Sequence, residues 1–228
     1  MFVLCRMQDV VRVAPHEMGT PLQAALERAL NRKLANKVVI NVGLCICVYD
    51  FERIQESYIL PNDGASHTKV HFRTVVFCPF VDEIITGQVR ANSRAGIHVT
   101  LDFFDDILVP ADKLPSPSRF NEAEQVWYWE YEEEDGQADE ELRHDDQQTA
   151  ESGEPMKLYI DIGKTVRLKV VELCFTDTAP SSAPTVEQTD TPATSNTNAT
   201  RPAPFTIIGT MGEPGLGCLE WWQPEETT

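Results

Sequence analysis

The first 80 residues carry apolar runs that flank one stripe of leucines at helical spacing. Residues 2–13 are mostly apolar and β-branched, which predicts a strand. After the pair Thr20-Pro21 the spacing becomes that of an amphipathic helix, with apolar side chains at Leu22, Leu26, Leu30 and Leu34. We expect Thr20 to be the N-cap of this helix and Asn36 to end it.

Two further strands are expected after the helix. Residues 38–49 are apolar almost throughout, which is typical of a strand covered on both faces, and we expect Cys45 and Cys47 to share one buried face. Residues 69–78 alternate between apolar and polar positions, as a half-buried strand does. The order strand, helix, strand, strand predicts a small domain over residues 1–80.

From residue 81 onward the pattern is one of short strands separated by glycine-containing turns. The strand candidates are residues 83–90, 96–101, 107–109, 126–131, 156–171, 205–211 and 216–222. Short strands without a strong helix are typical of a small barrel of the OB type. We therefore expect an α+β protein in which residues 81–228 form an all-β OB-fold barrel.

Two segments of the second domain have almost no apolar side chains. We expect them to be flexible insertions, at about residues 131–154 and 176–203. The formal net charge of the chain is −17, and −11 of it lies in residues 130–154. The total excludes a protein that coats nucleic acid by net attraction, but residues 155–174 have a net charge of +2. The acidity therefore belongs chiefly to an insertion and does not exclude a local RNA contact.

No arrangement of residues predicts catalysis. The carboxylates Asp102, Asp105 and Asp106 raise the alternative of a Mg²⁺-dependent hydrolase, but their spacing matches no metal-binding loop and a solvated turn is favoured. The six cysteines form no CxxC pair, and the glycines at 212, 215 and 217 are not followed by the lysine of a phosphate-binding loop. We expect no catalytic residues, no metal and no cofactor.

The barrel region has features of a nucleic-acid-binding surface. An OB barrel binds single strands by stacking bases on aromatic rings along a basic track. Trp127 and Trp129 are expected to share a face, and the barrel core is the favoured place for both. The candidate RNA-binding residues are Arg90, Arg94, His98, Lys113, Arg119, Lys164, Arg167 and Lys169. The alternative is that these cations only solvate the barrel.

The sequence also excludes some locations. It contains no apolar run of about 18 residues that could span a membrane. Residues 1–13 lack the basic start, apolar run and cleavage site of a secretory leader. We therefore expect neither a membrane partner nor secretion.

Several stretches resemble the larger stalk subunit of eukaryotic RNA polymerase III. They are LANKVV at 34–39, NVGLCIC at 41–47, DGASHTKVHFR at 63–73, CPFVDE at 78–83, GIHV at 96–99, FFDDIL at 103–108, FNEAEQVW at 120–127 and EPGLG at 213–217. The resemblance covers most of residues 1–131, 155–175 and 204–222. The stalk subunits of RNA polymerase II and of archaeal polymerase share the layout more than these stretches.

The resemblance implies a truncated RNP-like domain followed by an OB barrel. It also implies a non-catalytic nuclear subunit that forms a heterodimer with a small helical stalk subunit and docks on the core of RNA polymerase III. Such a subunit contacts nascent single-stranded RNA and initiation factors in the transcription of transfer RNA, 5S ribosomal RNA and other small RNA genes.

The resemblance places the candidate polymerase-docking tip, by position, at the turn Asn62, Asp63, Gly64, Ala65 and Ser66. A free-standing OB-fold RNA-binding adaptor, unattached to polymerase, is the alternative function.

Overall fold

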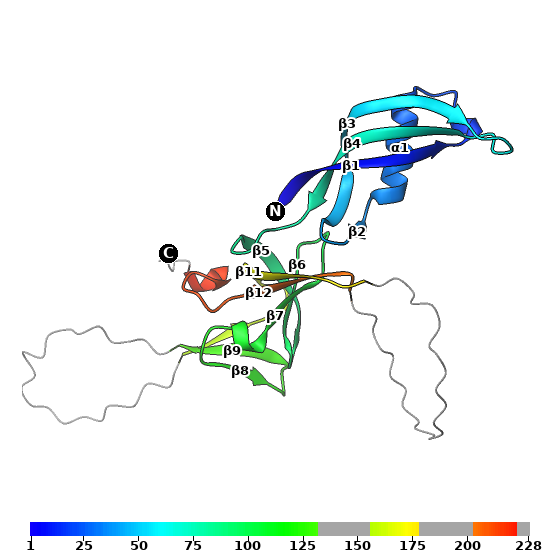
Figure 1. Ribbon diagram of the computed structural model, residues 1–228. Helices are drawn as coiled ribbons and strands as arrows, with labels where there is room; N and C mark the ends of the chain where they lie inside the picture. The colour runs from blue at the N-terminus through cyan, green and yellow to red at the C-terminus, as the bar shows by residue number, and fades with distance from the viewer. Residues whose placement is uncertain (132–155, 178–202, 223–228) are drawn as a thin grey trace, which may run out of the picture. The chain divides into compact units, whose positions relative to one another are not determined.

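The computed structural model describes residues 1–131, 156–177 and 203–222, which belong to two compact units (Figure 1). The first unit comprises Met1–Phe80 and Leu173–Thr206, and the second comprises Val81–Glu172 and Ile207–Thr228. The chain therefore returns to the first unit after its main passage through the second. The two expected insertions lie almost entirely outside the described residues.

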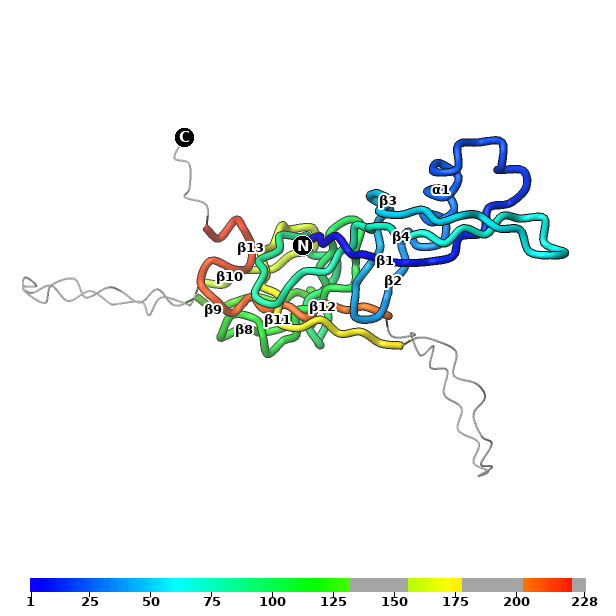
Figure 2. The backbone as a smooth tube through the Cα atoms, turned by 45° about the horizontal axis from the view of Figure 1, so that its top comes forward, coloured from blue at the N-terminus to red at the C-terminus, as the bar shows by residue number. Residues whose placement is uncertain are grey.

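The first unit is a four-stranded antiparallel sheet with a helix packed against it (Figures 1 and 2). Its strands lie in the order β1-β4-β3-β2, so β1 and β2 are the edges. The elements are β1 Phe2–Val13, a 3-10 turn at Pro15–Glu17, α1 Leu22–Leu34, β2 Lys37–Val39, β3 Gly43–Ile59 and β4 Ser66–Phe77. The predicted order strand, helix, strand, strand is confirmed for β1, α1, β3 and β4, and the structure adds the short edge strand β2.

The leucine stripe of α1 forms the core of this unit. Leu26 and Leu30 are fully buried and pack against Val13 of β1 and Phe72 of β4. The prediction that Thr20 caps the helix is wrong, because its hydroxyl donates to the carbonyl of Glu17 at 2.8 Å and the N-cap position falls on Pro21. No helix among the described residues is long and apolar enough to cross a membrane.

The apolar run at residues 38–49 is two strands and not one. β2 ends at Val39 and β3 begins at Gly43. Asn41 has φ of 61° and Gly43 has φ of 125°, so the turn uses left-handed backbone. A Cβ on Gly43 would lie 2.4 Å from the carbonyl oxygen of Phe77, so only glycine fits this position.

The two cysteines of β3 face opposite ways. Cys45 is fully buried, whereas Cys47 is exposed. The pairing of β3 with β4 shifts register between these two residues. Such a bulge inserts an extra residue and re-aims the side chains that follow it. The expectation that both cysteines share a buried face is therefore wrong for Cys47.

The second unit is built on a closed five-stranded barrel. Its strands pair in the ring β5-β6-β7-β12-β11, and β11 pairs back to β5. They are β5 Ile84–Ser93, β6 Gly96–Thr100, β7 Ile107–Pro110, β11 Thr165–Phe175 and β12 Phe205–Thr210. The last residues of β11, from Leu173, and the first two of β12 are counted in the first unit. β7 and β12 are parallel. The ring confirms the predicted OB-like barrel and, with the first unit, the α+β class.

A second, three-stranded sheet is inserted between β7 and β11. Its order is β10-β9-β8, with β8 Ser118–Asn121, β9 Val126–Tyr131 and β10 Met156–Ile160. β8 is short and was not among the expected strands. The expected strand at 216–222 is wrong beyond its start, because β13 covers only Gly217–Cys218 and a 3-10 turn follows at Leu219–Trp222.

We predict that Leu26→Ala destabilises the first unit far more than Leu22→Ala on the same helix. Leu26 is fully buried while Leu22 is 42% exposed. The cavity left by the buried leucine should cost about 2–5 kcal/mol, whereas the exposed change should cost about 0.5 kcal/mol. Urea unfolding followed by circular dichroism measures the difference. Equal midpoints for the two variants would contradict this packing.

Candidate functional site

The turn between β3 and β4 is held by a carboxylate at its centre. Asp63 accepts hydrogen bonds from Nε and Nη2 of Arg12, at 3.0 and 2.7 Å. Nε2 of His67 lies 3.0 Å from Oδ2 of the same carboxylate, and the amide of Ala65 donates to it at 3.4 Å. A bidentate arginine–carboxylate pair fixes geometry as well as charge. Asp63 thus ties the turn to β1 and β4.

The charge of this carboxylate is stabilised by its partners. The hydrogen bond from Arg12, followed by that from His67, holds the pKa of Asp63 well below its usual range. The same pair raises the pKa of Arg12, chiefly through the Asp63 hydrogen bond. The turn therefore keeps its ion pair at any pH near neutrality.

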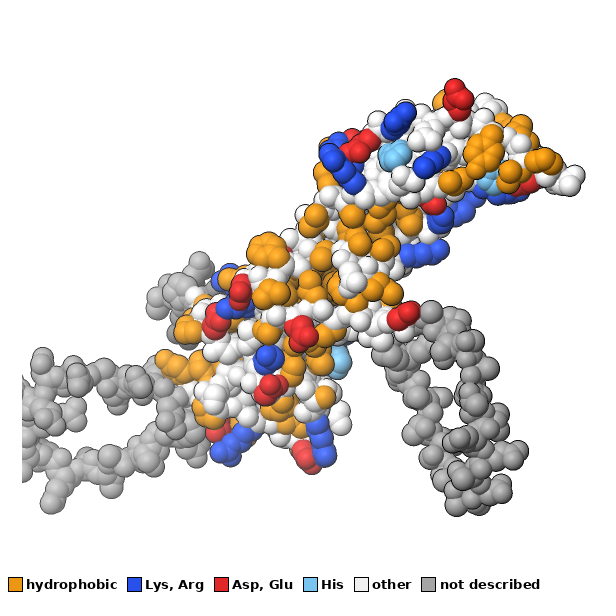
Figure 3. All heavy atoms as spheres, viewed as in Figure 1, with side chains coloured by type: hydrophobic (Ala, Val, Ile, Leu, Met, Phe, Trp, Pro, Cys, Tyr) orange, Lys and Arg blue, Asp and Glu red, His pale blue; other side chains and the backbone are white. Residues whose placement is uncertain are grey.

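Next to this anchor the end of β3 exposes apolar side chains. Tyr58, Ile59 and Leu60 are 49%, 64% and 44% exposed. Tyr58 stacks on His67 with ring centroids 5.8 Å apart, so the anchor also orients the patch. Figure 3 shows hydrophobic side chains gathered at this end of the first unit. An exposed apolar patch on a fixed turn is typical of a protein-interaction site.

The residues proposed for the tip from the sequence have different roles. Asn62 is exposed with φ of 68°, and Gly64 is also exposed. Ala65 is fully buried and Asp63 is the anchor. The candidate docking surface is therefore residues 58–60 together with Asn62, which we call the apolar tip. The sequence signal for it was an unbroken apolar triplet just before a turn, where strand alternation should place a polar residue.

Counting only partners among the described residues, five of the eight predicted RNA-binding residues form ion pairs with carboxylates. The pairs are Arg90–Asp105 at 2.8 Å, Arg94–Glu122 at 2.8 Å, Arg119–Glu130 at 3.3 Å, Lys164–Asp161 at 3.0 Å and Lys169–Asp82 at 3.3 Å. A phosphate would have to compete with these carboxylates for the cation. The predicted cations are therefore not a continuous unpaired track.

Both lysines in this set, Lys164 and Lys169, have a second carboxylate partner near the end of the described chain. Glu220 lies 3.4 Å from Nζ of Lys164, and Glu213 pairs with Lys169. Burial alone would lower the pKa of Lys164, but the hydrogen bonds that its ammonium donates to Asp161 and Glu220, with the charges of these carboxylates, outweigh burial and raise it. The pKa of Lys169 is raised chiefly by Glu213 and then by Asp82.

Arg167, on β11, differs from the paired cations. It lies on β11 between buried Val166 and Leu168, and its side chain is exposed. Within the described part of the chain it has no ion-pair partner. His98 lies on β6 and Lys113 follows β7, and both are partly exposed. Arg167 is consequently the β11 cation most available to a phosphate.

The acidic cluster is not arranged as a metal site. Oδ1 of Asp105 accepts a hydrogen bond from the Thr100 hydroxyl at 2.6 Å, and its Oδ2 pairs with Arg90. Burial, followed by the charge of Asp105, raises the pKa of Asp106. Within the described residues no group of three or more His, Cys, Asp or Glu side chains could hold a metal ion. The geometry gives no support to the hydrolase alternative.

Comparison with known proteins identifies the family. Residues 83–222 match the family model described as RNA polymerase III subunit Rpc25. Residues 8–64 match the SHS2 domain found in the N terminus of Rpb7p/Rpc25p/MJ0397. The chain belongs to the RNA polymerase III subunit Rpc25 family. The resemblance found in the sequence is confirmed.

Whole-length relatives agree with the family match. The chain is 47% identical over 222 residues to bovine DNA-directed RNA polymerase III subunit RPC8, covering 97% of this chain and 98% of the relative. It is 35% identical to the Schizosaccharomyces pombe subunit rpc8, covering 98% and 100%. The Saccharomyces cerevisiae subunit RPC8 is 30% identical, with the same coverage of 98% and 100%.

We predict that Asp63→Asn loosens the β3–β4 hairpin near neutral pH and removes part of its acid sensitivity. A carboxyl with a depressed folded-state pKa stabilises the fold above its unfolded pKa of about 3.9, and this stability is lost as pH falls toward the folded value. Hydrogen exchange of the hairpin amides, measured from neutral pH to about pH 3, reports the effect.

The matched control is Glu27→Gln on α1, which is exposed and has no ion-pair partner in the described ranges. Its exchange profile should follow that of the unmodified chain. Parallel pH profiles for Asp63→Asn and the unmodified chain would contradict the role of Asp63 as an anchor.

Proposed function

We propose that this chain is a non-catalytic stalk subunit of nuclear RNA polymerase III. The observation that carries the proposal is its 47% identity, over 97% of its length, to a bovine protein named as a subunit of that polymerase. On this proposal the chain acts in the transcription of transfer RNA, 5S ribosomal RNA and other small RNA genes. It contributes binding surfaces rather than chemistry.

The apolar tip is the proposed contact with the polymerase core. Binding energy at protein interfaces comes mainly from a few well-packed side chains near the centre of the contact. Tyr58, Ile59 and Leu60 offer such side chains, and the Arg12–Asp63 pair fixes the turn beside them before binding. A pre-organised turn loses less conformational entropy on docking than a flexible one.

The proposed small helical partner requires another surface of the first unit. A shallow apolar groove of about 460 Å³ is lined by residues of β1, β4 and the β2–β3 turn, among them Val3, Leu4, Val42 and Val76. Val3 and Leu4 are 52% and 46% exposed. An amphipathic helix buries its apolar face in a groove of this kind. We assign the heterodimer contact to this groove.

We predict that Ile59→Asp combined with Leu60→Asp releases the chain from the polymerase core but not from its small partner. A charge placed in a buried apolar contact remains unpaired and costs far more than the lost packing. Affinity purification of the tagged full chain, followed by quantification of co-purifying proteins, measures both associations.

Glu56→Ser, at an exposed position of β3, is the control and should retain both associations. Retention of the core by the double variant would refute the tip as the docking surface. Recovery of the unmodified chain with neither polymerase nor small partner would refute the polymerase proposal and favour the free-standing adaptor.

The RNA contact is proposed on the outer face of β11. Arg167 can bind a phosphate directly, whereas the ion pairs of Lys164 and Lys169 with carboxylates must first break. The remaining candidates, Arg90, Arg94, His98, Lys113 and Arg119, are proposed as secondary contacts. A surface of this kind binds RNA weakly and needs tethering to be effective.

We predict that Arg167→Ala reduces the salt dependence of RNA binding by one phosphate contact. The slope of log K against log salt for an oligouridine probe should fall by about 0.7, because each single-strand contact contributes about that amount. Glu213→Gln should strengthen binding, since it removes a charged partner of Lys169. Fluorescence anisotropy in a KCl series measures both effects.

Lys37→Ala removes an exposed cation from the first unit and is the charge-matched control. It should leave the slope unchanged. An unchanged slope for Arg167→Ala would remove this residue from the proposed contact, while the co-purification result would stand by itself.

A further inference from the structure

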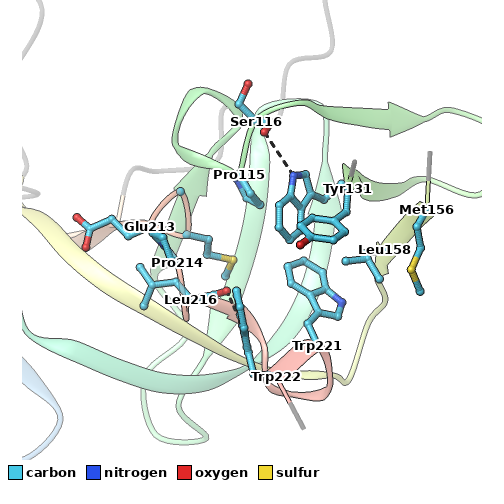
Figure 4. A pocket seen from close by; sticks show the side chains of 13 residues that line it. Pro115, Ser116, Tyr131, Met156, Leu158, Glu213, Pro214, Leu216, Trp221 and Trp222 are labelled. Atoms are coloured by element: carbon cyan, nitrogen blue, oxygen red, sulfur yellow. Dashed lines mark hydrogen bonds between the residues drawn. The ribbon is translucent and has the colours of Figure 1, made fainter. Parts of the chain in front are cut away.

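The second unit contains a hollow of about 610 Å³ with aromatic walls (Figure 4). Its side chains come from β9, β10, the loop before β8 and the segment around β13. The rings are Trp129, Tyr131, Trp221 and Trp222. Pro115 and Pro214 add flat apolar rings at the edge. We call this hollow the tryptophan pocket, and its size is typical of ligand-binding sites.

Strand alternation builds one wall of the pocket. Trp129 of β9 is paired with Leu158 of β10, and Tyr131 with Met156, so these four side chains share a face. The neighbouring pair Tyr128 and Tyr159 lies on the other face, with ring centroids 5.6 Å apart. The two faces of one hairpin therefore provide both the pocket and a matched surface outside it.

The indole rings are held in place before any ligand binds. Nε1 of Trp222 donates to the carbonyl of Leu216 at 3.0 Å, and Nε1 of Trp129 donates to that of Ser116 at 3.4 Å. Trp221 packs against Trp129, with ring centroids 5.5 Å apart.

Gly217 helps to position the Trp221 ring. Gly217 has φ of 95°, and a Cβ there would lie 2.4 Å from a ring carbon of Trp221. The ring therefore rests directly on backbone, which a side chain at this position would prevent. Rigid aromatic anchors lose little entropy on binding.

The charges of the described lining disfavour a nucleic-acid backbone. No lysine, arginine or histidine is among its described lining residues, and its one charged residue is Glu213. Single-stranded nucleic acid needs cations beside the stacking rings, because each phosphate is negative. The lining therefore favours a ligand without phosphates.

The available hydrogen-bonding groups narrow the ligand further. The hydroxyls of Tyr131 and Ser116 and the indole N–H of Trp221 bond to none of the other described residues, and all three can donate. Proline-rich peptides present carbonyl acceptors while their proline nitrogens carry no hydrogen. Their extended polyproline II form docks on aromatic-lined grooves at low entropic cost.

We propose that the tryptophan pocket binds an extended proline-rich segment of a protein partner. Flat proline rings lie between the indoles, and the donors of the pocket meet peptide carbonyls. The site shares no residue with the apolar tip, and it adjoins the RNA contact proposed for β11, because Glu213 lines the pocket and also pairs with Lys169. It gives the second unit a protein-binding surface in addition to its RNA contact.

The test uses the full chain labelled with ¹⁵N and a blocked oligoproline peptide of about ten residues, which spans about 3.1 Å per residue. The indole N–H signals of Trp129, Trp221 and Trp222 should shift along one binding curve. Trp127 is an internal control, because it is 7% exposed and its indole donates to the carbonyl of Ser93. Its signal should stay in place.

Variants separate the pocket from the rest of the unit. Trp221→Ala should weaken oligoproline binding about tenfold or more, as loss of a buried aromatic anchor does. Tyr131→Phe, which removes only a hydroxyl, should weaken it about threefold to tenfold and guards against misfolding of the first variant. Tyr159→Ala, on the opposite face of the hairpin, should bind like the unmodified chain.

Three results would overturn the proposal. One is the absence of indole shifts with oligoproline at about the millimolar concentration expected of weak peptide binding. Another is equal binding by Tyr131→Phe, Trp221→Ala and the unmodified chain. The last is that an oligouridine probe shifts the three pocket indoles while oligoproline does not, which would assign the pocket to RNA.

Discussion

The barrel depends on β11. The side chains of this strand alternate between the barrel core and the outer surface, so they set the core packing and also the charge outside it. β11 pairs with β5, β12 and β13, so it closes the ring and also positions the final segment. Val166, Leu168 and Val170 are fully buried, which commits the residues between them to the outer face. A one-residue slip of register would exchange the two sets, and burial of the apolar set forbids it.

The same constraint explains why the acidic chain can still present cations. Arg167 and Lys169 face outward because their neighbours are needed in the core. Lys169 pairs with Asp82 and Glu213, which lie in the segments that precede β5 and β13. Exposed ion pairs add little stability because solvent screens them. On the proposed RNA contact, their main effect is to occupy a cation that a phosphate would otherwise use.

Much of the fold follows from periodicity, but surfaces made by distant segments do not. The leucine stripe predicted α1 and the short alternating strands predicted the barrel, because burial imposes those periods locally. The bulge between Cys45 and Cys47 was missed because register depends on the partner strand. The anchor Arg12–Asp63 joins residues 51 apart in sequence, so no local pattern could reveal it.

The surroundings of the candidate site residues likewise depend on contacts between distant segments. The turn signal predicted the turn at residues 62–66, but strand alternation alone does not show that Ile59 stays exposed while Ala65 is buried. The basic residues were found by type, whereas their carboxylate partners depend on the fold. Trp221 and Trp222 were expected in a strand, and the 3-10 turn instead directs them into the pocket.

A weak RNA contact suits a subunit whose proposed role is to stay attached to a polymerase. With most predicted cations paired, the barrel offers few free charges, and free binding to RNA should be weak and salt-sensitive. Attachment through the first unit would raise the local concentration of RNA to about the millimolar range, where weak contacts are occupied. On that proposal the ion pairs are an advantage, because they suppress binding to RNA elsewhere while leaving the tethered contact effective. Specificity would then come from where the subunit is docked and not from the strength of its RNA contact.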